Sequence, residues 1–160
     1  MCEYYGCQSV TAIEELTREH DEVVTLISHA REARRAGDAG RVAEVAREIA
    51  AVLAPHTVVE EHGLFPAMAG DFPEKIAALE EEHRRIEAVL GEAATGVPAD
   101  PAWPDRLIGA LDLLRLHILK EQGGVFPAAL AFLGTKQWEA VEAVRARVGT
   151  RTPARPSRGG

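Results

Sequence analysis

The chain has 160 residues, enough for one domain with a real hydrophobic core, and its formal net charge is −7. This charge argues against a nucleic-acid-binding surface, and the basic stretch from Arg145 to Arg158 is interpreted as a solvated end. No apolar run approaches the roughly 20 residues of a membrane span, and the first residues lack the features of a secretion signal. We therefore expect a cytoplasmic protein that binds neither nucleic acid nor membrane.

Apolar residues make up 46% of the chain and aromatic residues only 5%, a balance that favours helices packed on helices. The capping-box spacing of Thr11 and Glu14 predicts where the first helix begins, and Pro55 is expected to kink the second. Proline, glycine and capping residues then predict five helices, at about 11–37, 38–66, 73–96, 104–125 and 135–148.

These elements predict an all-α fold, an up-down-up-down four-helix bundle followed by a short fifth helix. The expected organisation has four parts: a Cys- and Tyr-containing segment at 1–10, the bundle at 11–133, a C-terminal helix at 134–148 and a disordered tail at 149–160.

Two segments of the chain repeat. HTVVEEHGLFPA, from His56, and HILKEQGGVFPA, from His117, share H-x-x-x-E followed by Gly, an aliphatic residue and Phe-Pro-Ala at identical offsets. The second and fourth helices are therefore expected to be related by a pseudo-two-fold axis, and the shared His and Glu to have one role.

Each of the four bundle helices has one histidine on its apolar stripe, and two of them add a glutamate one turn later. These residues are His20, His56, His83 and His117, with Glu60 and Glu121. The histidines lie nine or ten residues from the same end of the bundle. At about 1.5 Å per residue this is roughly 15 Å, so the four imidazoles should meet in one layer.

Buried carboxylates without partners are costly, so this layer should contain a cation. Four imidazoles and two carboxylates are too many for one tetrahedral zinc site and suit two metal ions that share the carboxylates. Nitrogen and oxygen ligands without thiolate suit iron or manganese, although zinc could occupy the site in vitro. A metal-free cluster of His–Glu ion pairs is the alternative.

The histidines in TREHD and EEEHRRI, with the two H-x-x-x-E segments, resemble the hemerythrin-like (HHE) family over roughly residues 11 to 130. The resemblance implies an oxo- or hydroxo-bridged centre of two iron ions on His20, His56, Glu60, His83, His117 and Glu121. Oxygen-carrying hemerythrins have one more histidine, at the position of Glu87, which puts reversible oxygen carriage in question here. The pattern is more similar to iron-centre repair and nitric-oxide-responsive members. A ferritin-like site is excluded because Glu80-x-x-His83 is the only ExxH in the chain.

Other residues have two interpretations each. Glu87 is either an extra ligand or a charge at the edge of the stripe. Glu61 and Gln122 either hydrogen-bond the ligands or lie on the surface. His62 either delivers protons or lies off the ligand face.

The N-terminal segment is the hardest to interpret. Cys2 and Cys7 are either a redox pair near the metal site or two thiols of a frayed end, and Tyr4 or Tyr5 could cover the mouth of the site.

The first functional hypothesis is a non-haem di-iron protein, a monomer or homodimer, that binds or reacts with O2, NO or H2O2. Peroxide disproportionation and NO-related redox chemistry are the candidate activities. The alternative is an iron-dependent sensor or an iron-handling or storage module without significant turnover, and a purely structural bundle is the third option.

Overall fold

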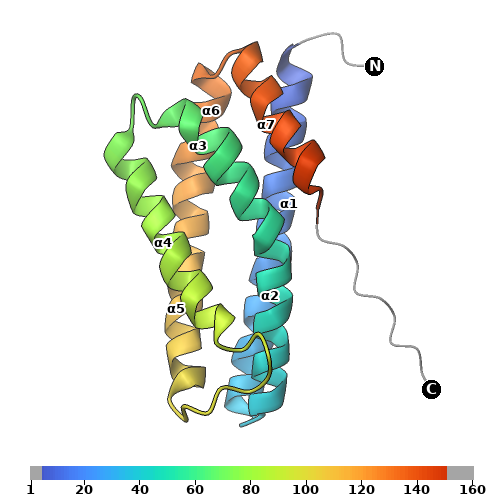
Figure 1. The fold of residues 1–160 in the computed structure, drawn as a ribbon, viewed down its shortest axis with the longest axis vertical. Helices are drawn as coiled ribbons and strands as arrows, with labels where there is room; N and C mark the ends of the chain where they lie inside the picture. Colours follow the sequence, from blue (N-terminus) through green and yellow to red (C-terminus); the bar gives the residue numbers. More distant parts are fainter. Residues whose placement is uncertain (1–4, 151–160) are drawn as a thin grey trace, which may run out of the picture.

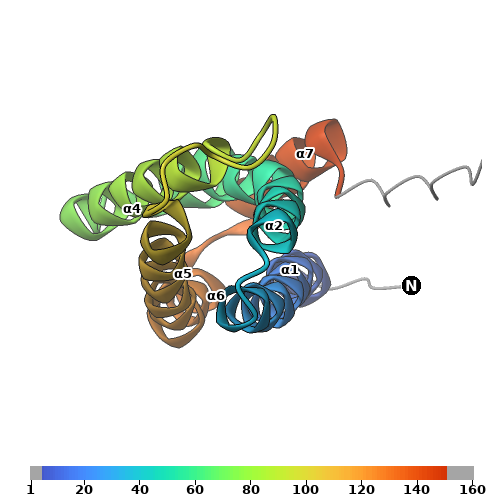
Figure 2. The ribbon, with the colours of Figure 1, turned by 90° about the horizontal axis from the view of Figure 1, so that it is seen from below.

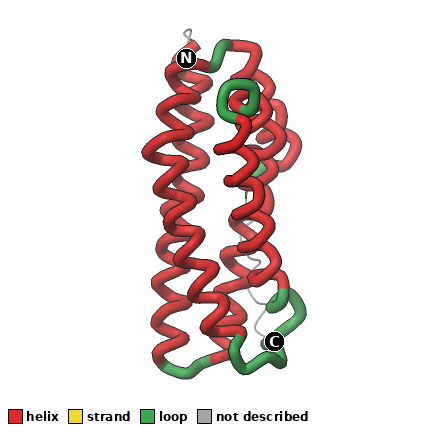
Figure 3. The backbone as a smooth tube through the Cα atoms, turned by 90° about the vertical axis from the view of Figure 1, so that its left-hand side faces the viewer, coloured by secondary structure: helices red, strands yellow, loops and turns green. Residues whose placement is uncertain are grey.

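The structure, a computed structural model, describes residues 5–150. Within these residues all regular elements are helical; most connections are short, and the longest loop, 92–102, joins α4 to α5 (Figures 1 and 3). In chain order they are α1 (Tyr5–Arg35), α2 (Ala39–Val59), the π-helix η1 (Glu60–Leu64), α3 (Phe65–Met68), α4 (Pro73–Gly91), α5 (Trp103–Lys120), the π-helix η2 (Glu121–Val125), α6 (Phe126–Phe132) and α7 (Thr135–Val148).

Four long helices pack around a common axis. α1 packs on α2, α2 on α4, α4 on α5, and α5 on α1, so the four form a closed ring, which Figure 2 shows end on. In Figure 1, α1 and α4 run downward while α2 and α5 run upward. The short helix α7 packs outside this ring, against α1, α2 and η1. Over the described part of the chain, no helix has the length and apolarity needed to cross a membrane.

The first helix begins earlier than its sequence signal predicts. α1 starts at Tyr5, so Thr11 lies inside the helix and the predicted capping box is wrong. The added turns pack against α7: the Gln8 side chain hydrogen-bonds Glu142, and Ser9 is buried. Tertiary packing therefore outweighs a local capping signal of modest energy.

The two H-x-x-x-E segments both pass from α-helix into π-helix at the glutamate. α2 continues through Pro55 to Val59, and η1 then begins at Glu60. The Phe65 N–H donates to the Glu60 carbonyl oxygen, five residues back in the chain, which is the π-helical pattern. The second repeat follows the same course from Glu121.

The Phe-Pro pair that closes each repeat gives a physical reason for this widening. Pro66 and Pro127 have no N–H, and in a regular α-helix each ring would press on the carbonyl four residues earlier. A wider turn just before the proline relieves that contact. The sequence repeat is therefore also a repeat of backbone geometry.

The hydrophobic interior consists of two clusters with a polar layer between them. One cluster fills the lower bundle between α1, α2, α4 and α5, and the other joins α1 and α4 to α3, α6 and α7. On α1, Leu16 belongs to the upper cluster and Val23 to the lower one, with His20 between them. The same order surrounds His83 on α4. The buried histidines are thus held in a layer with apolar packing on both sides.

Both repeats have a glycine at the same position, but only one of the two lies against α7, which allows a matched test of α7 packing. A Cβ added to Gly63 would lie 3.1 Å from Val141 Cα of α7, whereas one added to Gly124, the equivalent residue of η2, would meet nothing within 4 Å. We expect Gly63→Ala to be less stable than Gly124→Ala by roughly 1–3 kcal/mol, because backbone atoms of α7 must move. Urea unfolding of the two variants measures the difference. Equal stability would mean that α7 does not sit against η1 as described.

Candidate metal centre

Six side chains meet in the polar layer, one histidine from each long helix and one glutamate from the start of each π-helix. The four histidines are at most 5% exposed and the two glutamates are fully buried. Every imidazole directs Nε2 toward a carboxylate. The Nε2–Oε1 distances are 3.1 Å for His20–Glu121, 3.2 Å for His117–Glu121, 3.2 Å for His56–Glu60 and 3.3 Å for His83–Glu60.

The cluster contains two overlapping groups that are each suited to a metal ion. In both groups one ligand atom from each of four residues lies within 4.8 Å of the others. The first group is His20, His56, Glu60 and Glu121, and the second is Glu60, His83, His117 and Glu121. Both glutamates belong to both groups, as expected for carboxylates shared by two ions.

The outward-facing nitrogen of each histidine also has a partner. The Nδ1–Oε distances are 2.9 Å for His20–Gln122, 3.1 Å for His56–Glu19, 3.0 Å for His83–Glu61 and 2.7 Å for His117–Glu82. An ionised carboxylate can only accept, so Nδ1 carries the proton in the three His–Glu pairs. In the neutral imidazole the Nε2 lone pair then faces the centre, as metal binding requires.

The outer partners are fixed in turn by basic side chains. Each of the three outer carboxylates forms an ion pair: Glu19 with Arg145 of α7, Glu61 with Arg84, and Glu82 with Lys120. The fourth outer partner, Gln122, is a neutral amide. The outer shell is therefore charged around three histidines and neutral around His20.

Aromatic rings restrain two of the histidines. Phe126 stacks on His20 with ring centroids 5.4 Å apart, and Phe65 stacks on His83 at 5.8 Å. Both phenylalanines come from the Phe-Pro pairs of the repeats. The repeat therefore supplies a carboxylate, an outer hydrogen-bond partner and an aromatic wall from each half of the bundle.

The centre contains polar atoms that the described residues do not satisfy. Six buried side-chain atoms have no hydrogen bond of acceptable geometry: Nε2 of His20 and of His117, and both carboxylate oxygens of Glu60 and of Glu121. Burying such atoms without partners is costly, most of all for carboxylates. A cation between them would satisfy all six, so the residues present fit a metal site.

Proton binding in the centre shows how strongly these residues attract positive charge. Burial lowers the pKa of His56, but the Glu60 and Glu19 carboxylates outweigh burial and raise it to about 10. Burial likewise lowers the pKa of His117, and Glu121 and Glu60 raise it above its usual value. Burial raises the pKa of Glu60, while His56 brings it well below its ordinary value. Metal ions would therefore displace protons from these imidazoles.

The remaining candidates lie in different places. Glu61 and Gln122 contact histidines of the cluster, whereas the Glu87 side chain is 44% exposed and pairs with Arg84, outside both groups. His62 is exposed. Cys7 is half-buried near the start of α1, and Tyr5 is the first residue of that helix. Cys2 and Tyr4 lie outside the described residues, so a redox role for the cysteines stays a prediction.

Sequence reasoning missed two of the outer partners, Glu19 and Glu82. Each directly precedes a histidine of the cluster, giving Glu-His in both α1 and α4, just as Glu61 and Gln122 directly follow a glutamate of the cluster. The repeated Glu-His pair was a signal that could have identified them. The link from Glu19 to Arg145 has no such signal, because 126 residues separate the two.

Comparison with known proteins agrees with this geometry. The model of the hemerythrin HHE cation binding domain matches residues 11–129, well over half of the chain. Searches among curated proteins and among solved structures find no match. The family match covers all six clustered residues and ends before α7 begins. With its buried His/Glu cluster and all-helical fold, the chain belongs to the hemerythrin HHE cation-binding domain family.

Proposed function

We propose that the centre holds two iron ions, one in each of the two four-residue groups. His20 and His56 would bind one ion, His83 and His117 the other, and both carboxylates would be shared. The observation that carries this proposal is the set of six buried polar atoms without a hydrogen bond of acceptable geometry, distributed over two overlapping groups. A donor set of imidazole and carboxylate without thiolate suits iron or manganese.

The proposed function is binding of, or reaction with, a small ligand such as O2, NO or H2O2. Iron in such a site supplies one-electron redox chemistry, which suits peroxide disproportionation or NO-related reactions. The protein's own part is to hold the imidazoles by Nδ1, to keep bulk water away and to limit access. Ligand histidines at most 5% exposed, with two of them stacked against phenylalanine rings, favour a ligand of a few atoms over an organic substrate.

A second function, an iron-dependent sensor or iron-handling module, is favoured by one contact. His56 is linked through Glu19 to Arg145 of α7, a helix outside the region that matches the family. A change at His56 can therefore reach a surface helix that a partner protein could recognise. Slow turnover with ligand-dependent protease sensitivity of α7 would favour this function over catalysis.

The proposal is tested by metal content and visible spectrum of protein purified from iron-supplemented cells, before and after addition of H2O2. About two irons per chain, with near-ultraviolet bands that respond to peroxide, are expected for an oxygen-bridged iron pair at this donor set. Rapid loss of peroxide that depends on iron supports catalysis, whereas a spectral change without turnover supports the sensor. Finding no metal, or a single zinc, would contradict the di-iron proposal and indicate that the histidines have a structural role.

A further inference from the structure

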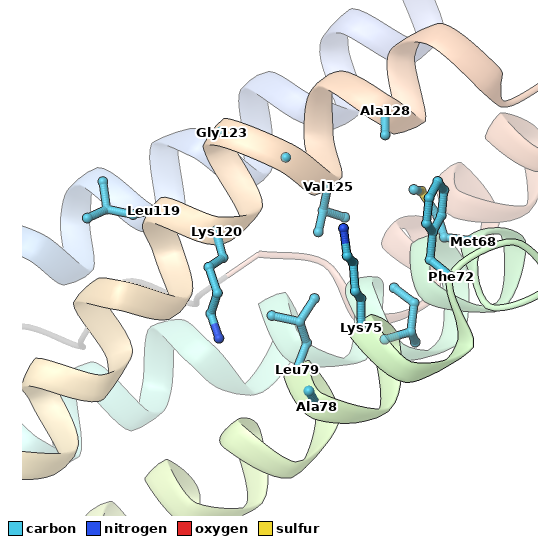
Figure 4. A pocket seen from close by; sticks show the side chains of 12 residues that line it. Met68, Phe72, Lys75, Ala78, Leu79, Leu119, Lys120, Gly123, Val125 and Ala128 are labelled. Atoms are coloured by element: carbon cyan, nitrogen blue, oxygen red, sulfur yellow. The ribbon is translucent and has the colours of Figure 1, made fainter.

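A pocket of about 580 Å³ lies between α4 and the segment formed by the end of α5, η2 and α6 (Figure 4). Its wall is mainly apolar and includes Met68, Phe72, Ile76, Leu79 and Leu119. Two glycines of η2 contribute backbone instead of side chains. Ligand pockets commonly have volumes of about 300–1,000 Å³ and apolar walls with few polar groups, so this pocket has the size and lining of a small-molecule site.

The polar groups of this pocket are cationic. The chain has three lysines, and two of them, Lys75 and Lys120, line the pocket, whereas no aspartate or glutamate does. In a chain with a formal charge of −7, this local excess of positive charge is not expected from composition. Figure 4 shows the two lysine side chains extending into the pocket from opposite walls.

The two ammonium groups differ in what they contact. Lys120 is paired with Glu82, whose other role is to hold Nδ1 of His117. Lys75 has no carboxylate within ion-pair distance among the described residues, and its Nζ lies 5.9 Å from the Phe72 ring centroid. Lys75 thus offers an uncompensated positive charge at the edge of an apolar wall.

We propose that this pocket binds an amphipathic monocarboxylate, the chemistry of a free fatty acid. A single unit of negative charge matches the one ammonium without a carboxylate partner, and an apolar chain matches the wall. A phosphate group would need more donors than the pocket provides, because no arginine fork lines it. This site is separate from the proposed metal chemistry and would exist whichever metal is bound.

The test is titration of the full-length, metal-loaded protein with decanoate, kept below its micelle-forming concentration, by isothermal calorimetry. Decanol serves as the uncharged comparison. We expect saturable binding of decanoate that is stronger than that of decanol. Lys75 is exposed, so Lys75→Gln should weaken decanoate binding by about two- to fivefold, the usual effect of losing an exposed ion pair. The matched control is Lys136→Gln, which removes the lysine that lies outside the pocket and should change nothing.

Two other residues of the pocket wall, Lys120 and Ala128, bear on this test. Lys120 is not the first variant, because removing it would also release Glu82 from its ion pair. Ala128→Phe, which places a ring in the pocket wall, should abolish decanoate binding while iron content stays unchanged. Absence of saturable decanoate binding would overturn the proposal. Equal binding of decanoate and decanol, or an equal effect of Lys75→Gln and Lys136→Gln, would overturn it as well.

Discussion

Glu60→Gln should remove both of the proposed metal ions from the centre rather than one. Glu60 belongs to both four-residue groups and is fully buried, and the amide of glutamine is a neutral and much poorer bridge. Loss of an outer partner alone typically lowers metal affinity by about 10–100-fold, so loss of a shared ligand should exceed about 100-fold. Metal analysis after dialysis against a weak chelator measures the effect.

Two variants control this result. Glu121→Gln changes the pseudo-symmetric carboxylate and should behave like Glu60→Gln, because it also belongs to both groups. Glu87→Gln removes a charge from α4 outside the centre, where the side chain is 44% exposed, and should leave metal content unchanged. Retention of one ion in Glu60→Gln would show that the groups bind metal independently. Metal loss in Glu87→Gln would indicate that Glu87 is a metal ligand.

The helical fold could be anticipated because its signals are local. Proline and glycine mark the ends of the helices, and the apolar stripes repeat at helical spacing, so each helix can be predicted without its neighbours. The start of α1 could not be predicted in this way, because its first turn depends on contacts with α7. The π-helical segments were also missed, although the Phe-Pro pairs that accompany them were visible as a repeat.

The six clustered residues could be predicted for a similar reason. Each histidine interrupts an apolar stripe, and a polar residue on a buried stripe stands out in a sequence. Glu19 and Glu82 lie beside the stripe, where charged residues are ordinary, so only the repeated Glu-His pair marks them. The Lys75–Lys120 pocket was equally hidden, since its two walls come from different helices and no local pattern relates them.

Arg145→Met should lower the metal affinity of the centre, because Arg145 links α7 to it through Glu19. The Arg145 guanidinium donates to both carboxylate oxygens of Glu19, at 2.6 and 3.0 Å, and Glu19 holds Nδ1 of His56 at 3.1 Å. Without the arginine, a carboxylate with little exposure loses its cation and His56 loses a fixed partner. We expect metal affinity to fall by about 10–100-fold in the group containing His56. Under chelator competition, the protein should therefore pass through a state with one ion.

The control for this prediction is Arg147→Met, which removes an exposed arginine two residues further along α7. Arg145→Lys keeps the charge but not the two-pronged geometry, so it should restore part of the affinity. If Arg145 has only a structural role, Arg145→Met should lower the unfolding temperature and leave the two proposed ions equally retained. The helix would still dock, since α7 also packs through Trp138 and Val141. Unequal loss of the ions would instead make α7 part of the metal site. Because α7 lies outside the residues that match the family, this contact to the centre would then come from a part of the chain that the family match does not cover.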